Sequence, residues 1–223
     1  MNGANPYQSL YKLKRYSRLM QFDRFSGVTV SYNLTNTNND SGDEMNDWQC
    51  DLVRYGMRRP FLKEQSIWAV WLYRQGRRID LRSAGPGKKF QTTLYWLAFR
   101  VVETMTGVSL PKSATIGPGL RIWHFGSIFI HPDTKIGANC TLRQGVTIGN
   151  RHVDGPVPVL GDDVEIGAYA QILGGVKIGN NCRTGAMSVV LTDMPDGSTA
   201  VGAPARLVFQ PQVDVPAKQA IAA

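Results

Sequence analysis

A repeat of six residues runs through the second half of this 223-residue chain. Stepping by six from Ile130 to Val190 meets eleven positions, and all but Asp154 and Thr184 are aliphatic. The residues two places before these positions are mostly small or β-branched, so two side chains of each hexad share one face, as in a short strand. A glycine follows these six-residue steps six times, at Gly137, Gly149, Gly161, Gly167, Gly179 and Gly185.

Short strands joined by glycine-permitted corners wind a chain into a parallel β-coil. Three hexads make one triangular turn, and successive turns pair with each other at a spacing of about 4.8 Å. The aliphatic positions then form one continuous inner column. The sequence therefore predicts a β-helix over the second half of the chain.

Two interruptions of the repeat are expected to be functional. The frame extends backward through Ile116 and Ile122, but it shifts by two residues before Ile130, and His124 lies inside that shift. In the segment 150–158 (NRHVDGPVP), the repeat would bring Asp154 into the column, where a charge has a severe desolvation cost. We expect this segment to leave the coil as a loop, of the kind that often builds the binding face of a solenoid.

The first half of the chain has a different organisation. Segment 33–46 is rich in Asn, Asp, Ser and Thr and is expected to be a mobile linker. Apolar residues then recur at helical spacing, which predicts three helices broken near Pro60 and by Gly85–Gly87. The stretch 94–102 is too short to cross a bilayer and contains Arg100, so we expect a buried helix. The predicted organisation is a flexible polar segment (1–46), a small helical region (47–108), the β-helix (109–209) and a C-terminal tail (210–223).

Composition sets looser limits. The net charge of +8 suits an anionic partner, but the scattered cations equally suit a solvated surface, and no nucleic-acid motif is present. Three widely spaced cysteines favour neither a disulfide framework nor a zinc site. The N-terminus lacks the pattern of a secretory signal, so a cytoplasmic location is expected.

Several motifs go beyond the repeat. They are Leu142–Asn150 (LRQGVTIGN), Ile166–Ala168, Ile172–Gly174, Gly185–Val190 (GAMSVV) and Gly202–Arg206 (GAPAR). With them, residues 109–209 resemble the hexapeptide-repeat acyltransferases. Within these, the resemblance is to the serine acetyltransferase-like branch, which includes capsule and exopolysaccharide O-acetyltransferases; residues 47–106 are more weakly similar. The resemblance implies a mainly β fold, a left-handed parallel β-helix from about Thr115 to Val208. It also implies acetyl-CoA as co-substrate without a metal, and a homotrimer that binds acetyl-CoA between neighbouring β-helices.

The resemblance also implies roles for individual residues. His124 matches the catalytic histidine, which would act as general base toward an acceptor hydroxyl. Residues that would approach acetyl-CoA are Gly149, Asn150, Gly167, Ala168, Gly185 and Ala186, with Arg206 near the adenosine end. The coil needs its corner glycines in any case, so a purely structural role remains open for each of them. Trp123, Arg151 and His152 are candidates for substrate contacts, whereas His131 is expected on an outer corner.

This chain departs from the serine-specific pattern at three positions. Trp123 stands where an aspartate usually precedes the catalytic histidine, Ser109 where another aspartate orients it, and Val157 where a second, substrate-binding histidine stands. Without these acids an α-ammonium acceptor is less favoured, and an aromatic at Trp123 suits the face of a sugar ring, although it would also suit packing in a trimer interface. A backbone carbonyl or Ser109 would then have to orient His124.

The preferred function is therefore O-acetylation of a carbohydrate hydroxyl in a surface polysaccharide or its precursor, and serine O-acetylation is the alternative. A metal-dependent β-helix of the γ-carbonic anhydrase type is disfavoured, because it needs two histidines five residues apart, and His124 and His131 are seven apart. A non-catalytic scaffold remains a different class. A peripheral contact with the inner membrane face is a further expectation, based on the basic and aromatic residues Trp68, Trp71, Arg74, Arg77, Arg78 and Arg82.

Overall fold

The computed structural model describes residues 17–23, 27–33, 45–56 and 60–208, and the chain divides into two compact units at residue 44. In the first unit, β1 (Ser17–Asp23) pairs antiparallel with β2 (Gly27–Asn33), which the sequence did not predict. The rest of the segment expected to be flexible lies outside the described residues, apart from Met45 and Asn46, and so does the expected tail 210–223.

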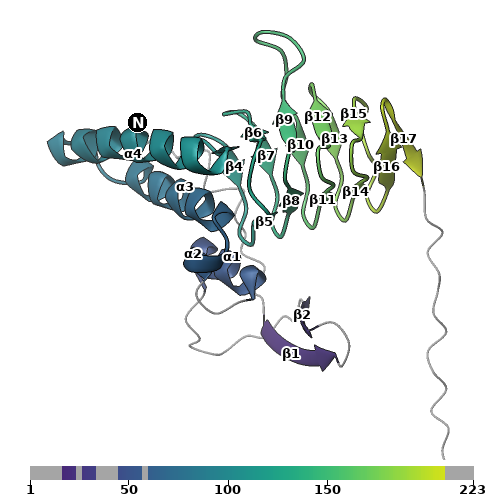
Figure 1. Ribbon diagram of the computed structural model, residues 1–223, viewed down its shortest axis with the longest axis horizontal. Coiled ribbons are helices and arrows are strands. Elements are labelled where there is room, and N and C mark those ends of the chain that lie inside the picture. Colours follow the sequence, from purple (N-terminus) through teal and green to yellow (C-terminus); the bar gives the residue numbers. More distant parts are fainter. Residues whose placement is uncertain (1–16, 24–26, 34–44, 57–59, 209–223) are drawn as a thin grey trace, which may run out of the picture. The chain divides into compact units, whose positions relative to one another are not determined.

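The second unit begins with four helices, α1 (Asp47–Tyr55), α2 (Pro60–Lys63), α3 (Ser66–Asp80) and α4 (Pro86–Thr106) (Figure 1). Helix α1 starts with a capping box, in which Asn46 and Gln49 bond reciprocally, and α4 has proline at its start. Both predicted breaks are present, because α2 and α4 begin at Pro60 and Pro86. The short helix α2 is an additional element.

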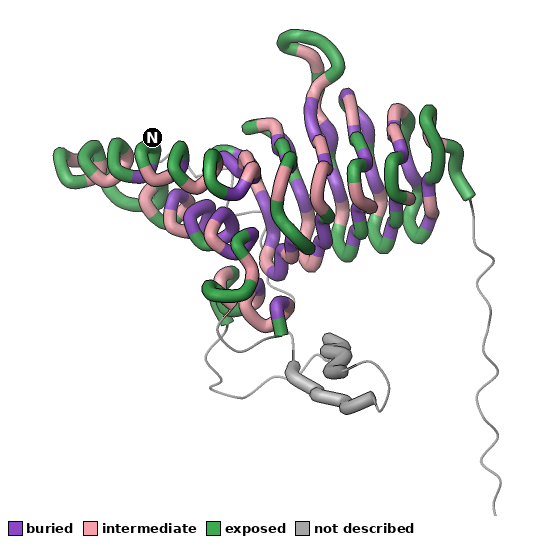
Figure 2. Tube along the Cα trace, viewed as in Figure 1, coloured by how far each residue is buried: buried purple, intermediate pink, exposed green. Residues whose placement is uncertain are grey.

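Helix α4 is not the buried helix that its composition predicted. Only Tyr95, Phe99 and Thr106 are buried, because α4 packs on one side against α3. Most of α4 is exposed or half-buried (Figure 2). A stripe of large apolar side chains on the other side is 51–71% exposed and consists of Phe90, Leu94, Leu97, Val101 and Met105. No described helix is both long and apolar enough to cross a membrane.

The remainder is the predicted left-handed β-helix, a coil of three parallel sheets. The first sheet contains β3 (Val108–Ser109), β6 (Ile128–Ile130), β9 (Thr147–Gly149), β12 (Gln171–Leu173) and β15 (Val189–Val190). The second contains β4 (Thr115–Ile116), β7 (Lys135–Ile136), β10 (Val159–Leu160) and β13 (Lys177–Ile178). The third contains β5 (Arg121–Trp123), β8 (Thr141–Arg143), β11 (Glu165–Ile166), β14 (Arg183–Thr184) and β16 (Thr199–Gly202), and ends with the antiparallel β17 (Ala205–Val208).

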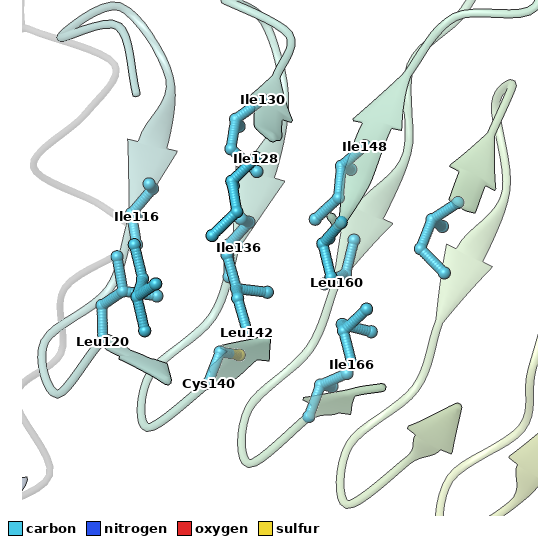
Figure 3. Packing of buried hydrophobic residues seen from close by; sticks show 14 of the residues in the cluster. Ile116, Leu120, Ile128, Ile130, Ile136, Cys140, Leu142, Ile148, Leu160 and Ile166 are labelled. Atoms are coloured by element: carbon cyan, nitrogen blue, oxygen red, sulfur yellow. The ribbon is translucent and has the colours of Figure 1, made fainter. Parts of the chain in front are cut away.

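The aliphatic positions of the repeat form the inner column, as predicted (Figure 3). Each aliphatic member from Ile116 to Val190 is at most 4% exposed. Thr184 is also buried, and its hydroxyl accepts a hydrogen bond from the Gly167 N–H at 3.1 Å, so a polar residue is tolerated there. Asp154 is exposed, and the chain between β9 and β10 projects as a loop, which confirms the predicted interruption (Figure 1).

A buried ion pair connects the helices to the first turn of the coil. The Arg74 guanidinium on α3 bonds both carboxylate oxygens of Asp51 on α1, at 2.8 and 3.0 Å. It also donates to the carbonyls of Ile116 and Gly117, at 2.8 and 2.7 Å, and Asp51 accepts from the Leu120 N–H at 2.8 Å. Burial raises the pKa of Asp51, and the hydrogen bonds from Arg74 oppose that rise. Arg74 is 4% exposed, so the expectation that it would face a membrane is wrong.

Removing one partner of this pair should destabilise the whole second unit. Arg74→Met leaves the Asp51 carboxylate buried without its partner, which costs about 3–5 kcal/mol of unfolding free energy. Asp47, a 58% exposed carboxylate on the same guanidinium, provides the matched control, and Asp47→Asn should cost about 1 kcal/mol or less. Urea unfolding followed by circular dichroism measures both, and equal losses would contradict this role of Asp51.

Candidate functional site

The candidate residues lie on two long edges of the triangular coil. We define the His124 edge as the corners between the third and first sheets, residues 124–127, 144–146, 167–170 and 185–188. The loop edge comprises the corners between the first and second sheets, residues 131–134, 150–158, 174–176 and 191–193. Because the first sheet runs from one edge to the other, one face of the coil separates them.

His124 stands at the first corner of its edge, directly after β5. Its φ of 64° is in the left-handed region that non-glycine residues rarely adopt, and its side chain is exposed. The Trp123 ring centroid lies 6.5 Å from that of His124. Among the residues that the structure describes, none hydrogen-bonds or ion-pairs with the His124 side chain. The expected hydrogen bond between His124 and Ser109 or a backbone carbonyl is therefore not present among the described residues.

Backbone donors remain open further along the His124 edge. At the corners between the second and third sheets, the N–H groups of Ala138, Asp162 and Asn180 each donate to an Asp or Asn side chain of the next turn. Ala168 and Ala186 occupy the same repeat position on the His124 edge, but their N–H groups have no partner among the described residues. A backbone N–H is a strong donor that is rarely left unpaired once it is covered, so these two are suited to a ligand carbonyl.

The glycines differ in what requires them. A Cβ at Gly167 would lie 2.6 Å from the Gly185 carbonyl carbon, so stacking of the turns alone explains this glycine. Gly185 is less crowded, with Val201 at 3.0 Å, and Gly149 has space, with the nearest atom at 3.7 Å. Arg206 pairs with Val201 between β16 and β17, which brings it to the far end of the His124 edge.

The loop edge contains a pocket of about 430 Å³. Arg151 and His152 line it from the loop, and the segments 173–176 and 191–193 line it from the coil. Arg151 donates from Nη2 to the Leu191 carbonyl at 3.0 Å, which fastens the loop across two turns. Gly174 and Gly175 make room for this loop, because added Cβ atoms would lie 3.2 Å from Arg151 and 2.8 Å from Pro156. The sequence did not predict that segments 173–176 and 191–193 line this pocket. The adjacent glycines Gly174 and Gly175 were the signal that could have indicated a close approach of another segment.

The predicted site residues therefore form two groups. His124, Gly167, Ala168, Gly185 and Ala186 belong to the His124 edge, and Trp123 in β5 and Arg206 in β17 lie next to it. Asn150, Arg151 and His152 belong to the loop edge, and Gly149 precedes them as the last residue of β9. His131 also belongs to the loop edge, and its Nδ1 accepts from the Asp133 N–H at 3.2 Å. One chain alone does not bring the two groups together.

A three-sided parallel coil built on this repeat is the fold of the hexapeptide transferases. The family model "Bacterial transferase hexapeptide (six repeats)" matches residues 158–192. A serine acetyltransferase of Bacillus pumilus is 39% identical over 131 residues, which are 54% of this chain and 58% of the relative. WcaB of Escherichia coli, assigned by its name to acetyl transfer in colanic acid biosynthesis, is 41% identical over 108 residues, which are 48% of this chain and 67% of WcaB.

Solved structures of serine acetyltransferases are similar to this chain in fold. The serine acetyltransferase of Neisseria gonorrhoeae has a TM-score of 0.64 at 30% identity, covering 74% of this chain and 65% of that one. A serine acetyltransferase in complex with CoA has a TM-score of 0.60 at 27% identity, covering 73% and 68%. The chain belongs to the serine acetyltransferase-like branch of the hexapeptide-repeat acyltransferases. It spans 58–66% of the length of three serine acetyltransferases that it matches.

The loop should be removable without loss of the coil. Ile148 and Leu160 are twelve residues apart, so deletion of the six residues 151–156 restores the spacing of one hexad. We expect far-UV circular dichroism and the thermal midpoint to stay close to those of the full chain, because the deleted residues are exposed or half-buried and lie outside every strand. As a control, deletion of the six residues 165–170, which include β11, should abolish cooperative unfolding. An equal loss of thermal stability in both deletion variants would contradict the assignment of residues 151–156 to a loop outside the coil.

Proposed function

We propose that this protein transfers an acetyl group from acetyl-CoA to a carbohydrate hydroxyl, with His124 as general base. The observation that carries the proposal is the row of open donors on the His124 edge, where the N–H groups of Ala168 and Ala186 follow the histidine along the coil. The pantetheine arm of CoA contains amide carbonyls, which such donors bind. A serine acetyltransferase of similar fold has been solved in complex with CoA, which supports CoA as the ligand of this protein.

The chemistry then follows from one base and one leaving group. The acceptor oxygen attacks the carbonyl carbon of the thioester while an imidazole nitrogen of His124 takes the hydroxyl proton. The carbon–sulfur bond breaks, the proton passes to the CoA sulfur, and an acetyl ester and free CoA are released. Arg206, at the far end of the same edge, is suited to the phosphates at the adenosine end.

Two residues favour a sugar over serine as the acceptor. Trp123 is 36% exposed beside His124, and aromatic faces bind the C–H face of a sugar ring. Ser109 stands where the serine-specific enzymes place an acid, so the carboxylate that an α-ammonium group would need is missing there. The names of several relatives favour serine acetylation, which is the second candidate.

Product analysis separates the two acceptors. We expect incubation with acetyl-CoA and a panel of methyl α-D-glucoside, methyl α-D-galactoside, N-acetyl-D-glucosamine and L-serine to yield an acetylated sugar by mass spectrometry. Removing the base in His124→Ala should lower the rate about 10²–10⁴-fold, whereas His131→Ala on the other edge should not. Product from L-serine alone would overturn the sugar assignment, and an unchanged rate for His124→Ala would overturn the mechanism.

We also propose that the active form is a trimer in which the His124 edge of one copy meets the loop edge of the next. The outward row of the first sheet, which connects these edges, is Ser109, Phe129, Thr147, Gln171 and Val189. It has no charged residue, whereas the outward rows of the other two sheets contain Lys135 and Lys177, or Arg121, Glu165 and Arg183. Uncharged surface with an aromatic, here Phe129 at 55% exposure, is typical of subunit contacts.

A charge in this row should separate the copies. We expect Phe129→Glu to convert a trimer to a monomer in light scattering coupled to size exclusion, because a carboxylate would be buried at the contact. Lys135→Glu, an outward position on the next strand of the same turn, should remain trimeric. Co-expression of His124→Ala with the 151–156 deletion should regain activity that neither has alone. Full activity of the Phe129→Glu monomer would contradict the shared site.

A further inference from the structure

Strand β5, which leads directly to His124, is fastened by two helices. The Ile122 N–H donates to the Tyr55 hydroxyl of α1 at 3.4 Å, and the Ser66 hydroxyl of α3 donates to the Ile122 carbonyl at 3.0 Å. Ile122 itself is fully buried in the column. The N–H and the carbonyl of Ile122 therefore both have partners in the helices. The side chains of Arg121 and Trp123, on either side of it, extend from a rigid strand.

Arg121 and Trp123 both alternate away from the column, so their side chains lie on the same outer face of β5. The Arg121 guanidinium carbon is 3.6 Å from the centroid of the Trp123 ring, a close cation–π stack. Tyr55 lies on the same guanidinium with its ring centroid at 5.4 Å. An Arg121 N–H also donates to the Arg54 carbonyl at the end of α1. The guanidinium is thereby held between a helix end and the indole.

Three features single out this stack. The Arg121 Nε is buried without a hydrogen-bond partner among the described residues, so its position is dictated by stacking rather than by a full set of bonds. Burial lowers the pKa of Arg121, yet a guanidinium stays charged, which a lysine in the same place would do less reliably. Arg183, the other arginine of this register row, has no aromatic ring of the described chain stacked on its guanidinium.

We propose that Arg121 is a positioning residue that holds the Trp123 indole beside His124, so that the open part of the indole receives the ring of the acceptor sugar. This inference rests on the proposed function and adds a specificity determinant to it. One part of the indole is covered by Arg121, and 36% of Trp123 stays accessible next to the base. A hexopyranose has the apolar ring face that such a platform binds, whereas free serine has none.

The test compares Arg121→Met and Arg121→Lys with Arg183→Met, which removes an arginine from the same register row, three turns further along the third sheet. With the best sugar of the panel, Arg121→Met should raise the acceptor KM about tenfold, equivalent to one 1.4 kcal/mol interaction, and leave the KM for acetyl-CoA unchanged. Arg121→Lys should recover part of the loss, since it retains charge without planarity. Arg183→Met should resemble the unmodified protein.

A double-mutant cycle distinguishes positioning from a general structural role. Trp123→Ala should raise the acceptor KM by itself, and adding Arg121→Met to it should have little further effect, because the platform is already gone. Strictly additive effects, an unchanged acceptor KM, or equal increases in both KM values would overturn the inference while the sugar activity stands. An unmodified protein that acetylates only L-serine would overturn the proposed function through its product, and the sugar platform with it.

Discussion

The guanidinium of Arg74 is the interaction on which the start of the coil depends. A parallel coil leaves carbonyl and N–H groups unpaired at its first turn, and buried groups of this kind are costly. Arg74 satisfies the carbonyls of Ile116 and Gly117, while Asp51 satisfies the Leu120 N–H. Because α1 and α3 supply these side chains, the helical region is the end cap of the column. It also fixes β5, and therefore the corner at which His124 stands.

The architecture was largely predictable because the burial that stabilises the coil is periodic along the chain. Burial of one aliphatic side chain every six residues leaves a signal that needs no knowledge of distant contacts, and the exposed Asp154 follows from the cost of a buried charge. Helix α4 shows the limit of composition. Apolar residues lie on several sides of this helix, but only the side that meets α3 is covered. The spacing of apolar residues in the sequence does not show how many neighbouring elements a helix packs against.

The candidate site was predictable as a set of residues but not as an arrangement. His124 and the loop at 150–158 both appeared as breaks in the repeat, yet their separation onto different edges depends on which pair of sheets each corner joins. The open N–H groups of Ala168 and Ala186 have no sequence signal at all, since they are defined by the absence of a described side-chain acceptor in the next turn. Arg121 was missed because the contacts that hold its guanidinium over Trp123 come from α1, where Tyr55 is sixty-six residues away in sequence.

The reversed strand β17 has a consequence for how copies can assemble. It pairs antiparallel with β16, from Thr199↔Val208 to Gly202↔Ala205, and so ends the third sheet with a change of direction. A second coil stacked end-on would meet a strand that runs the wrong way for continuing a parallel ladder. At the opposite end, α1 and α3 cover the first turn. Continuation of the parallel third sheet from one coil into a second coil along the axis is thus disfavoured.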